Sequence, residues 1–166
     1  MVRRVSLGKA ECPIARALDV VGDWWSLLII RDAIDGIRRF SEFQENLGVA
    51  KGILTTRLRD LVDADVLRQA PASDGSAYSE YILTEKGRDL FHVLVALRQW
   101  GEDHLYERGE RHSVLIDNRS KRPVPRLELR SASGEVLSAA NTTVSRLPRI
   151  SATRKRSTKP DQAKHQ

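Results

Sequence analysis

The stretch that decides the fold is RRFSEFQENLGVAKGILTTRLRDLVDAD, which runs from residue 38 to residue 65. Its first half predicts a helix of about two turns, with its start near Ser41, whose apolar residues are Phe40, Phe43 and Leu47. Gly48-Val49-Ala50 then predicts a tight turn, and the periodicity after Lys51 predicts a second helix with four inward residues: Leu54, Leu58, Leu61 and Val62. Two short helices joined by a glycine-containing turn are the outline of a helix-turn-helix.

Two further helices are expected before this stretch. Pro13 suits the first turn of a helix over residues 12–21, which Gly22 ends. Asp23 can cap the next helix, whose apolar face is expected to hold Trp25, Leu28, Ile29 and Ala33. Residues 37–39 leave room for no more than a stub of strand before the helix-turn-helix begins.

A hairpin is expected directly after the helix-turn-helix. Residues 66–70 and 78–83 can form its two strands, around the turn-rich residues 71–76. Thr84 is then expected to cap one long helix. A helix-turn-helix followed by a hairpin is a winged helix, so the predicted fold class is α+β, mainly helical, with a small antiparallel wing.

Composition and patterning divide the chain into segments. They are an N-terminal arm over 1–11, a winged-helix domain over 12–108, a C-terminal extension over 119–150 and a basic tail over 151–166. Alternation at 126–130 and 136–138, around Ser133-Gly134-Glu135, predicts a short hairpin in the extension. The tail is polar and basic, and we expect it to be disordered.

Charge is distributed unevenly along the 166 residues, whose net charge is +6. Residues 119–166 hold 12 Lys and Arg against 3 Asp and Glu, whereas residues 1–118 hold 16 against 19. The basic character therefore belongs to the C-terminal part, and only a local cluster can argue for nucleic-acid binding by the helical part. Residues 37–59 form such a cluster, with five Lys and Arg against two Glu.

Several classes of protein are excluded by composition. The single cysteine, Cys12, cannot form an intrachain disulfide, which fits a reducing cytoplasm. No apolar run approaches the ~20 residues of a membrane span, and none follows the basic start as a secretory signal requires. The four histidines lack metal-ligand spacing, and no phosphate loop or serine-histidine-aspartate set is visible. We therefore expect a cytoplasmic protein that is no enzyme and has no metal, cofactor or membrane partner.

Five sequence motifs follow one another between about residues 7 and 105. They are CPIARAL with GDWWSLLI (12–18 and 22–29), RRFSEF (38–43), LTTRLRDL (54–61), EYILTEKG (80–87) and LRQWG (97–101). In this order and spacing they resemble the HxlR-type transcriptional regulators, bacterial homodimeric winged-helix proteins related to MarR proteins. The resemblance implies DNA binding without catalysis, by a dimer on a pseudo-palindromic duplex.

The same resemblance makes residues 54–61 the recognition helix. If its leucines point inward, helical geometry turns five residues outward: Lys51, Gly52, Thr55, Thr56 and Arg59. Lys51 is expected to meet a phosphate, the two threonines to reach base edges or thymine methyl groups, and Arg59 to address guanine or phosphate. Gly52 would let the backbone approach the duplex closely.

Three cations and one serine complete the expected DNA-binding set. Arg38 and Arg39 place two positive charges directly before the first helix of the motif. Arg57 lies at the margin of the buried stripe, where it can hold a phosphate or pair with a carboxylate such as Glu42. Ser41 is included, although the role of N-cap is favoured for it over a DNA contact.

The wing departs from the pattern of the family. Many members carry an arginine at the place that Tyr78 holds here, and residues 69–85 contain no Lys or Arg at all. We therefore expect the wing to contribute little phosphate binding, with Tyr78 acting as an ordinary strand residue.

The last predicted helix carries more apolar surface than one small winged helix can cover. The expected dimer interface consists of Ile14, Leu18, Leu90, Phe91, Leu94, Leu97 and Trp100. Trp25 is in phase with the apolar face of its helix and is assigned to the core. Trp24 lies off that face and is expected to line the dimer interface or a pocket for a small-molecule effector.

Cys12 has two interpretations. An isolated cysteine is most often a small buried apolar residue. Alternatively, its place at a helix N-terminus, one turn before Arg16, would stabilise a thiolate. A cysteine at this place in the HxlR-type family serves some members as a sensor of oxidants or electrophiles, so Cys12 is the candidate redox-sensing residue.

The leading interpretation is a homodimeric DNA-binding regulator, a repressor that responds to a small molecule or to a redox or electrophile signal. A second interpretation is a winged-helix module for protein-protein contacts without specific DNA binding, which would not need the local cations. A third, a cysteine-dependent enzyme, would need a base near Cys12, and the sequence offers none.

Overall fold

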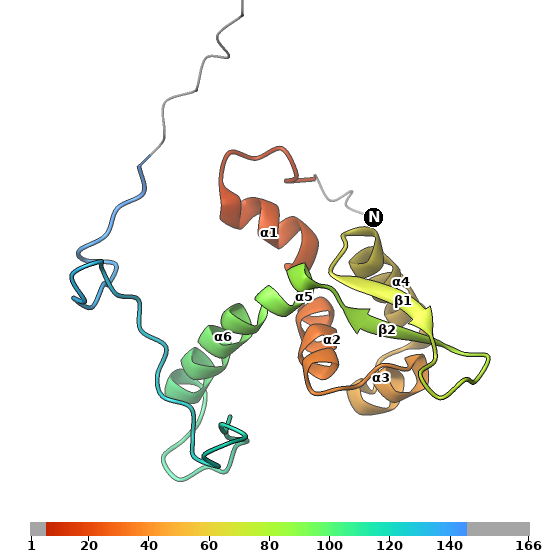
Figure 1. Ribbon diagram of the computed structural model, residues 1–166. Helices are drawn as coiled ribbons and strands as arrows, with labels where there is room; N and C mark the ends of the chain where they lie inside the picture. Colours follow the sequence, from red (N-terminus) through yellow and green to blue (C-terminus); the bar gives the residue numbers. More distant parts are fainter. Residues whose placement is uncertain (1–5, 146–166) are drawn as a thin grey trace, which may run out of the picture. The chain divides into compact units, whose positions relative to one another are not determined.

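The computed structural model of the protein describes residues 6–145, so the expected basic tail lies outside the described residues. The chain forms two compact units, residues 1–127 and residues 128–166. The first unit contains every helix and strand of the described residues: α1 Pro13–Val21, α2 Trp24–Ile34, α3 Phe40–Leu47, α4 Lys51–Asp63, β1 Leu67–Pro71, β2 Ser79–Leu83, α5 Glu85–Asp89 and α6 Phe91–His104 (Figure 1). None of the helices in residues 6–145 is both long and apolar enough to cross a membrane.

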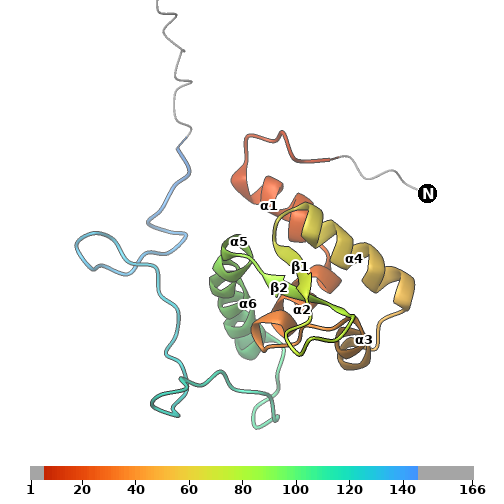
Figure 2. The same cartoon turned by 45° about the vertical axis from the view of Figure 1, so that its right-hand side comes forward.

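α2 is the central element of this winged helix and contacts α1, α3, α4, α6 and β2 (Figures 1 and 2). It begins as expected, because the backbone N–H of Ser26 donates to Asp23 Oδ1 at 3.0 Å. Its predicted apolar face is only partly right: Ile29 is fully buried, but so is Ile30, which lies outside that face. A helix enclosed on several sides buries more than one stripe of residues, which explains the difference.

A buried carboxylate ties α2 to α3. Asp32 is almost completely buried and accepts hydrogen bonds from the side chains of Arg31, at 2.7 Å, and Asn46, at 2.8 Å. These partners compensate the cost of removing its charge from water.

The helix-turn-helix forms as the sequence predicts. Gly48 ends α3 in the left-handed region, with φ +60°, which a glycine adopts without strain. Beyond the turn, α4 buries three of the four residues that its periodicity predicted to point inward, and the fourth, Val62, is partly buried against the core. The residues of α3 and α4 that are fully buried are Phe43, Leu54, Leu58 and Leu61.

The wing is an antiparallel pair of five-residue strands in which Leu67 lies opposite Leu83 and Pro71 opposite Ser79. β1 has the expected length but lies one residue later in the sequence, so Val66 is outside the ladder and Pro71 is inside it. β2 is one residue shorter than expected, because Tyr78 lies outside the ladder. The stub at residues 37–39 is no strand and is joined to β2 by one hydrogen bond, from the N–H of Tyr81 to the carbonyl of Arg38 at 2.8 Å.

The prediction of one long helix after Thr84 is wrong, because the chain breaks at Leu90 into α5 and α6. Thr84 does act as the cap, accepting from the N–H of Gly87 at 3.1 Å. Gly87 then packs so closely that an added Cβ would lie 2.2 Å from the carbonyl oxygen of Val66. α5 is thus held against the base of the wing, and the N–H of Leu90 turns to the carbonyl of Gly87 before α6 starts.

Between the end of α6 and residue 145, the last that the structure describes, the backbone contains only short pairings. In the first unit, Ile116 and Pro123 form an isolated antiparallel bridge that the sequence did not predict. In the second unit, the expected hairpin is a single bridge between Arg130 and Val136, with Gly134 in the turn at φ +86°.

Candidate nucleic-acid interface

The outward face of α4 is the centre of the candidate interface. The buried leucines fix its orientation, and Lys51, Gly52, Thr55 and Arg59 are exposed, while Thr56 is half-buried. Space around Gly52 is open, with nothing within 4 Å of an added Cβ. Two thirds of the Arg59 side chain, 66%, is accessible, and its guanidinium lies 3.6 Å from Asp60. An exposed pair at this distance restrains the arginine weakly.

The two threonines present fewer donors than their hydroxyl groups suggest. Thr55 Oγ1 donates to the carbonyl of Lys51 at 2.8 Å, and Thr56 Oγ1 donates to that of Gly52 at 2.9 Å. Each hydroxyl hydrogen is therefore used within the helix. What remains for a ligand is the acceptor capacity of the oxygen and the methyl group.

Arg57 does not join this outward face. It pairs with carboxylates, which is one of its two expected roles, but the partners are Asp23 and Asp60 in place of Glu42. Its Nε lies 3.2 Å from Asp23 Oδ1 and its Nη1 lies 3.4 Å from Asp60 Oδ2. Asp23 is within reach because the N-terminus of α2 packs beside α4, a tertiary contact that sequence spacing does not show. Arg57 thus fastens α4 to α2, and it contributes to the interface by holding the helix.

Arg38 and Arg39 are also engaged, with carboxylates of the wing. Arg38 lies 3.6 Å from Glu80, and Arg39 pairs with Asp74 in the loop between the strands. The cluster that counts +3 in sequence therefore faces two acids in space, and the expectation of a freely presented basic patch is corrected at these two positions.

The two wing carboxylates differ in their surroundings. Glu80 is buried, and its Oε1 accepts from the N–H and the hydroxyl of Ser73, at 3.2 and 3.0 Å. Asp74 is half exposed and accepts from the N–H of Ser76 at 3.0 Å. The hydrogen bond from Arg39, together with those from Ser76, holds the pKa of the Asp74 carboxyl well below its usual range. The same pairing raises the pKa of Arg39, so both groups carry full charge at neutral pH.

The interpretation of Ser41 as an N-cap is wrong. Arg39 holds the cap position of α3, and Ser41 is an exposed residue inside the helix. Glu42 binds the two backbone N–H groups that directly precede the helix: its Oε2 accepts from the N–H of Arg39 at 3.0 Å and from the N–H of Arg38 at 3.2 Å. These bonds lower the pKa of Glu42, because they stabilise its charged form.

Cys12 is exposed and forms no disulfide, so its interpretation as a buried apolar residue is wrong. It occupies the cap position of α1, directly before Pro13. Arg16 does not turn toward it, because Arg16 Nε donates to the carbonyl of Ala10 at 2.6 Å.

Exposed apolar residues lie on α1, on α6 and at the start of α2. The expected interface residues are largely exposed in the single chain: Ile14, Leu18, Phe91, Leu97 and Trp100, with Leu90 and Leu94 half-buried. Trp24 is 74% exposed, whereas Trp25 packs against the core. A cleft of about 550 Å³ runs between α2 and α6, and its walls include Trp24, Phe91, Leu97 and Tyr106.

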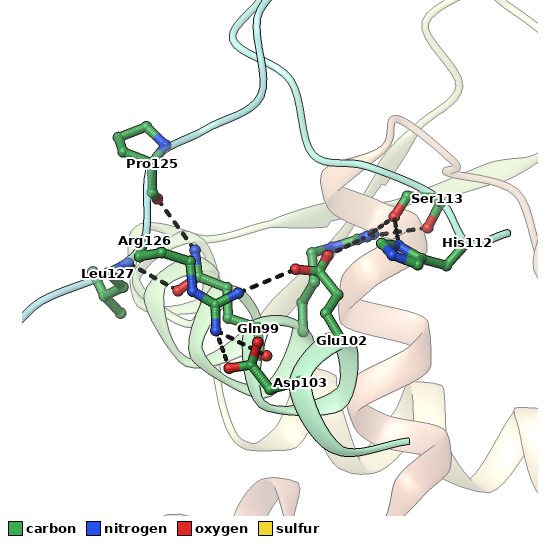
Figure 3. A network of polar contacts seen from close by, with 9 residues as sticks. Gln99, Glu102, Asp103, His112, Ser113, Pro125, Arg126 and Leu127 are labelled. Atoms are coloured by element: carbon green, nitrogen blue, oxygen red, sulfur yellow. Dashed lines mark hydrogen bonds and ion pairs between the residues drawn. The ribbon is translucent and has the colours of Figure 1, made fainter. Parts of the chain in front are cut away.

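One polar network was missed entirely by sequence reasoning (Figure 3). The side chain of Gln99 on α6 donates to the carbonyl of Pro125 at 3.2 Å and accepts from the N–H of Leu127 at 2.8 Å. Arg126 pairs with Asp103 and lies 3.5 Å from Glu102. The acids near the end of α6 therefore hold residues 125–127 against the helix.

No group of three or more His, Cys, Asp or Glu side chains within residues 6–145 is arranged to hold a metal ion.

Comparison with known proteins identifies a family whose sequence model covers most of the winged helix. The sequence model described as HxlR-like helix-turn-helix matches residues 20–109. An HTH-type transcriptional regulator of Mycobacterium tuberculosis is 46% identical over 92 residues, which are 55% of this chain and 58% of the relative. The chain therefore spans little more than half the length of that curated relative.

Two solved structures extend the comparison. The crystal structure of PA1607, described as a candidate transcription factor, is 53% identical with a TM-score of 0.82, and the match covers 86% of this chain and 99% of that one. The oxidised form of the redox regulator HypR is 32% identical with a TM-score of 0.51, over 56% of this chain and 97% of that one. The longer match to PA1607 reaches beyond the family's winged helix into the C-terminal part.

Proposed function

The chain belongs to the HxlR-like helix-turn-helix family, and from this premise we propose that it is a transcriptional regulator that binds DNA as a homodimer and acts as a repressor. The observation that carries the proposal is the division of α4 into two faces. Leu54 and Leu58 are fully buried, while Arg59 on the opposite face is exposed, as is Lys51 at the first position of the helix. A helix held from behind, with cations in front, is what entry into a major groove requires.

Roles on DNA follow from the surroundings of each side chain. Lys51, at the start of α4, is assigned to a phosphate, and Arg59 to a guanine or a phosphate. Thr55 and Thr56 would contact base edges as acceptors or pack their methyl groups on thymine, since their hydroxyl hydrogens are used internally. Open space at Gly52 permits close approach of the duplex.

Dimerisation would bury the apolar surface of α1 and α6. Trp100 is 54% exposed and Leu97 is 49% exposed, and Ile14 on α1 is 70% exposed. Large apolar residues exposed in this number on a single chain are typical of a subunit interface. A symmetric dimer would place two copies of α4 about one helical turn of DNA apart, on a pseudo-palindromic site.

The protein has features that suit two kinds of regulatory signal, a small-molecule effector and an oxidant or electrophile. The cleft between α2 and α6 is large and apolar enough for a small-molecule effector, with Trp24 in its wall. Cys12 is exposed and free, and the similar protein HypR is named a redox regulator. We assign Cys12 as the candidate sensor for oxidants or electrophiles on these two grounds.

The test is selection of bound sequences from a pool of random duplexes by the full chain, followed by mapping of the selected motif to the genome of origin. We expect enrichment of a pseudo-palindromic sequence with half-sites about one turn apart, bound by two chains. A pool that stays random after repeated selection would refute sequence-specific DNA binding. Light scattering on the same sample would refute the dimer if it gave the mass of one chain.

A further inference from the structure

An acidic residue of the wing, Asp74, pairs with Arg39, a cation that the interface would otherwise present unpaired. Figures 1 and 2 show the loop between β1 and β2 beside the start of α3, and the ion pair between Asp74 in this loop and Arg39 joins the two segments. Residues 69–85, which include the whole loop, contain no Lys or Arg that could bind phosphate instead.

Asp74 is held in position for this contact before any ligand arrives. One carboxylate oxygen accepts from the N–H of Ser76 at 3.0 Å, and the other contacts Arg39. The loop that carries it is itself ordered, since the N–H of Gly75 donates to the carbonyl of Ala72 at 3.1 Å and Gly75 takes φ +76°.

The pair can nevertheless open. The side chain of Asp74 is 52% accessible and that of Arg39 is 33% accessible, so water and an incoming phosphate reach both groups. Glu80, the other wing acid, is 4% accessible and is tied to Ser73, so its contact with Arg38 belongs to the fixed structure. Of the two ion pairs between the wing and residues 38–39, the pair of Arg39 and Asp74 is the one placed to exchange its carboxylate for a phosphate.

We propose that Asp74 is a specificity-determining residue, which occupies Arg39 until a correctly placed DNA phosphate displaces it. This inference rests on the proposed function. For an arbitrary duplex, Arg39 would exchange a fixed carboxylate for a loosely placed phosphate, and the released carboxylate would repel the DNA backbone. On the proper site, base contacts from α4 fix the position of the duplex, so a phosphate stays opposite Arg39. Asp74 thus lowers non-specific binding more than specific binding.

The prediction concerns Asp74→Asn, which keeps the size of the side chain and removes its charge. The control is Asp89→Asn, which makes the same change of charge at an exposed residue of α5 outside the interface. Each full-length variant is titrated with two duplexes, one of random sequence and one selected by the wild type, between about 50 and 200 mM salt.

We expect Asp74→Asn to bind the random duplex about two- to fivefold more tightly than wild type, as for one exposed ion pair gained. The slope of log K against log salt should steepen by about 0.9, which corresponds to one additional phosphate contact. The ratio of specific to random affinity should fall. Asp89→Asn should leave both the slope and the ratio unchanged.

Asp74→Asn could increase affinity by freeing Arg39 or by removing a negative charge that repels DNA. Repeating the substitution in a protein that also carries Arg39→Ala separates these two effects. In Arg39→Ala, the substitution Asp74→Asn should increase affinity for the random duplex by less than it does when Arg39 is present, because only the repulsion by the carboxylate is then removed. A gain of equal size in that background would overturn the proposal, as would equal behaviour of Asp74→Asn and Asp89→Asn. If the wild type itself showed no preference for any selected duplex, the proposed function would fail along with this inference. Preference in the wild type with no effect at Asp74 would overturn the inference alone.

Discussion

Arg57 of α4 lies 3.2 Å from the carboxylate of Asp23, the residue that begins α2. The same carboxylate accepts from the N–H and the hydroxyl of Ser26, at 3.0 and 2.5 Å. One side chain therefore starts the central helix and fastens the helix that faces outward. The orientation of α4 depends on this contact as well as on its buried leucines.

Replacing Asp23 should separate these two roles. Asp23→Ala removes the cap and the ion pair, and we expect a loss of about 1–2 kcal/mol in the free energy of unfolding. Asp23→Asn keeps a good cap, so its loss should stay below about 1 kcal/mol. Denaturant unfolding of both variants measures the difference. Equal losses in the two variants would contradict a role for the cap.

Glu42 should make stability depend on acid pH. Its pKa is lowered in the folded chain by hydrogen bonds from the backbone of Arg39 and Arg38. A lowered pKa stabilises the fold above the unfolded value near 4.5, and this contribution is lost as the pH falls through the folded pKa. Glu42→Gln should therefore reduce Tm at neutral pH, and the difference from wild type should close in acid. A constant difference across this range would show that the charge of Glu42 is not responsible.

The helix-turn-helix could be predicted from sequence because its signals are local. The spacing of Leu54, Leu58 and Leu61 fixed which face of α4 is buried, and Gly48 marked the turn. The break at Leu90 could not be predicted in this way. It follows the close packing of Gly87 on Val66, a contact between residues that the periodicity of α6 does not include.

In the candidate site, too, features set by local sequence could be predicted, and features set by tertiary contacts could not. Arg59 is exposed as helical geometry requires, whereas Lys51, which the 100° step places beside the buried stripe, is exposed because it begins the helix. The partners of Arg39 and Arg57 lie 35 and 34 positions away in sequence, at Asp74 and Asp23, so a local count of charge could not reveal them. Such pairings are set by how α3, α4 and the wing pack together.

Gln99 should protect the backbone of residues 125–127 from hydrogen exchange. Gln99→Leu keeps the approximate volume but removes the acceptor for the N–H of Leu127 and the donor to Pro125. We expect faster hydrogen exchange at Leu127, with α2 and α4 unchanged. Gln69→Leu, on the exposed side of β1, is the control and should leave this exchange rate as it is. Unaltered protection at Leu127 in Gln99→Leu would show that the network does not hold the segment.

Cys12 should link oxidation to DNA binding if it is the sensor. Mild oxidation with diamide should produce a disulfide, with a second chain or with a small thiol, that non-reducing electrophoresis or intact mass detects. Affinity for the selected duplex should then change in the wild type and stay constant in Cys12→Ser. Unchanged affinity of the fully oxidised wild type would leave Cys12 without a sensing role.

The most direct test of the account compares Arg59→Ala with wild type on the selected duplex and on duplexes altered at single base pairs. If Arg59 reads a base, the substitution should cost about 1–3 kcal/mol of binding free energy, and discrimination should be lost at one base pair of each half-site. Lys51→Ala, the matched control for a phosphate contact, should weaken all duplexes alike and reduce the salt slope by about one. Wild-type affinity and discrimination in the double variant Lys51→Ala/Arg59→Ala would contradict the claim that the outward face of α4 binds DNA.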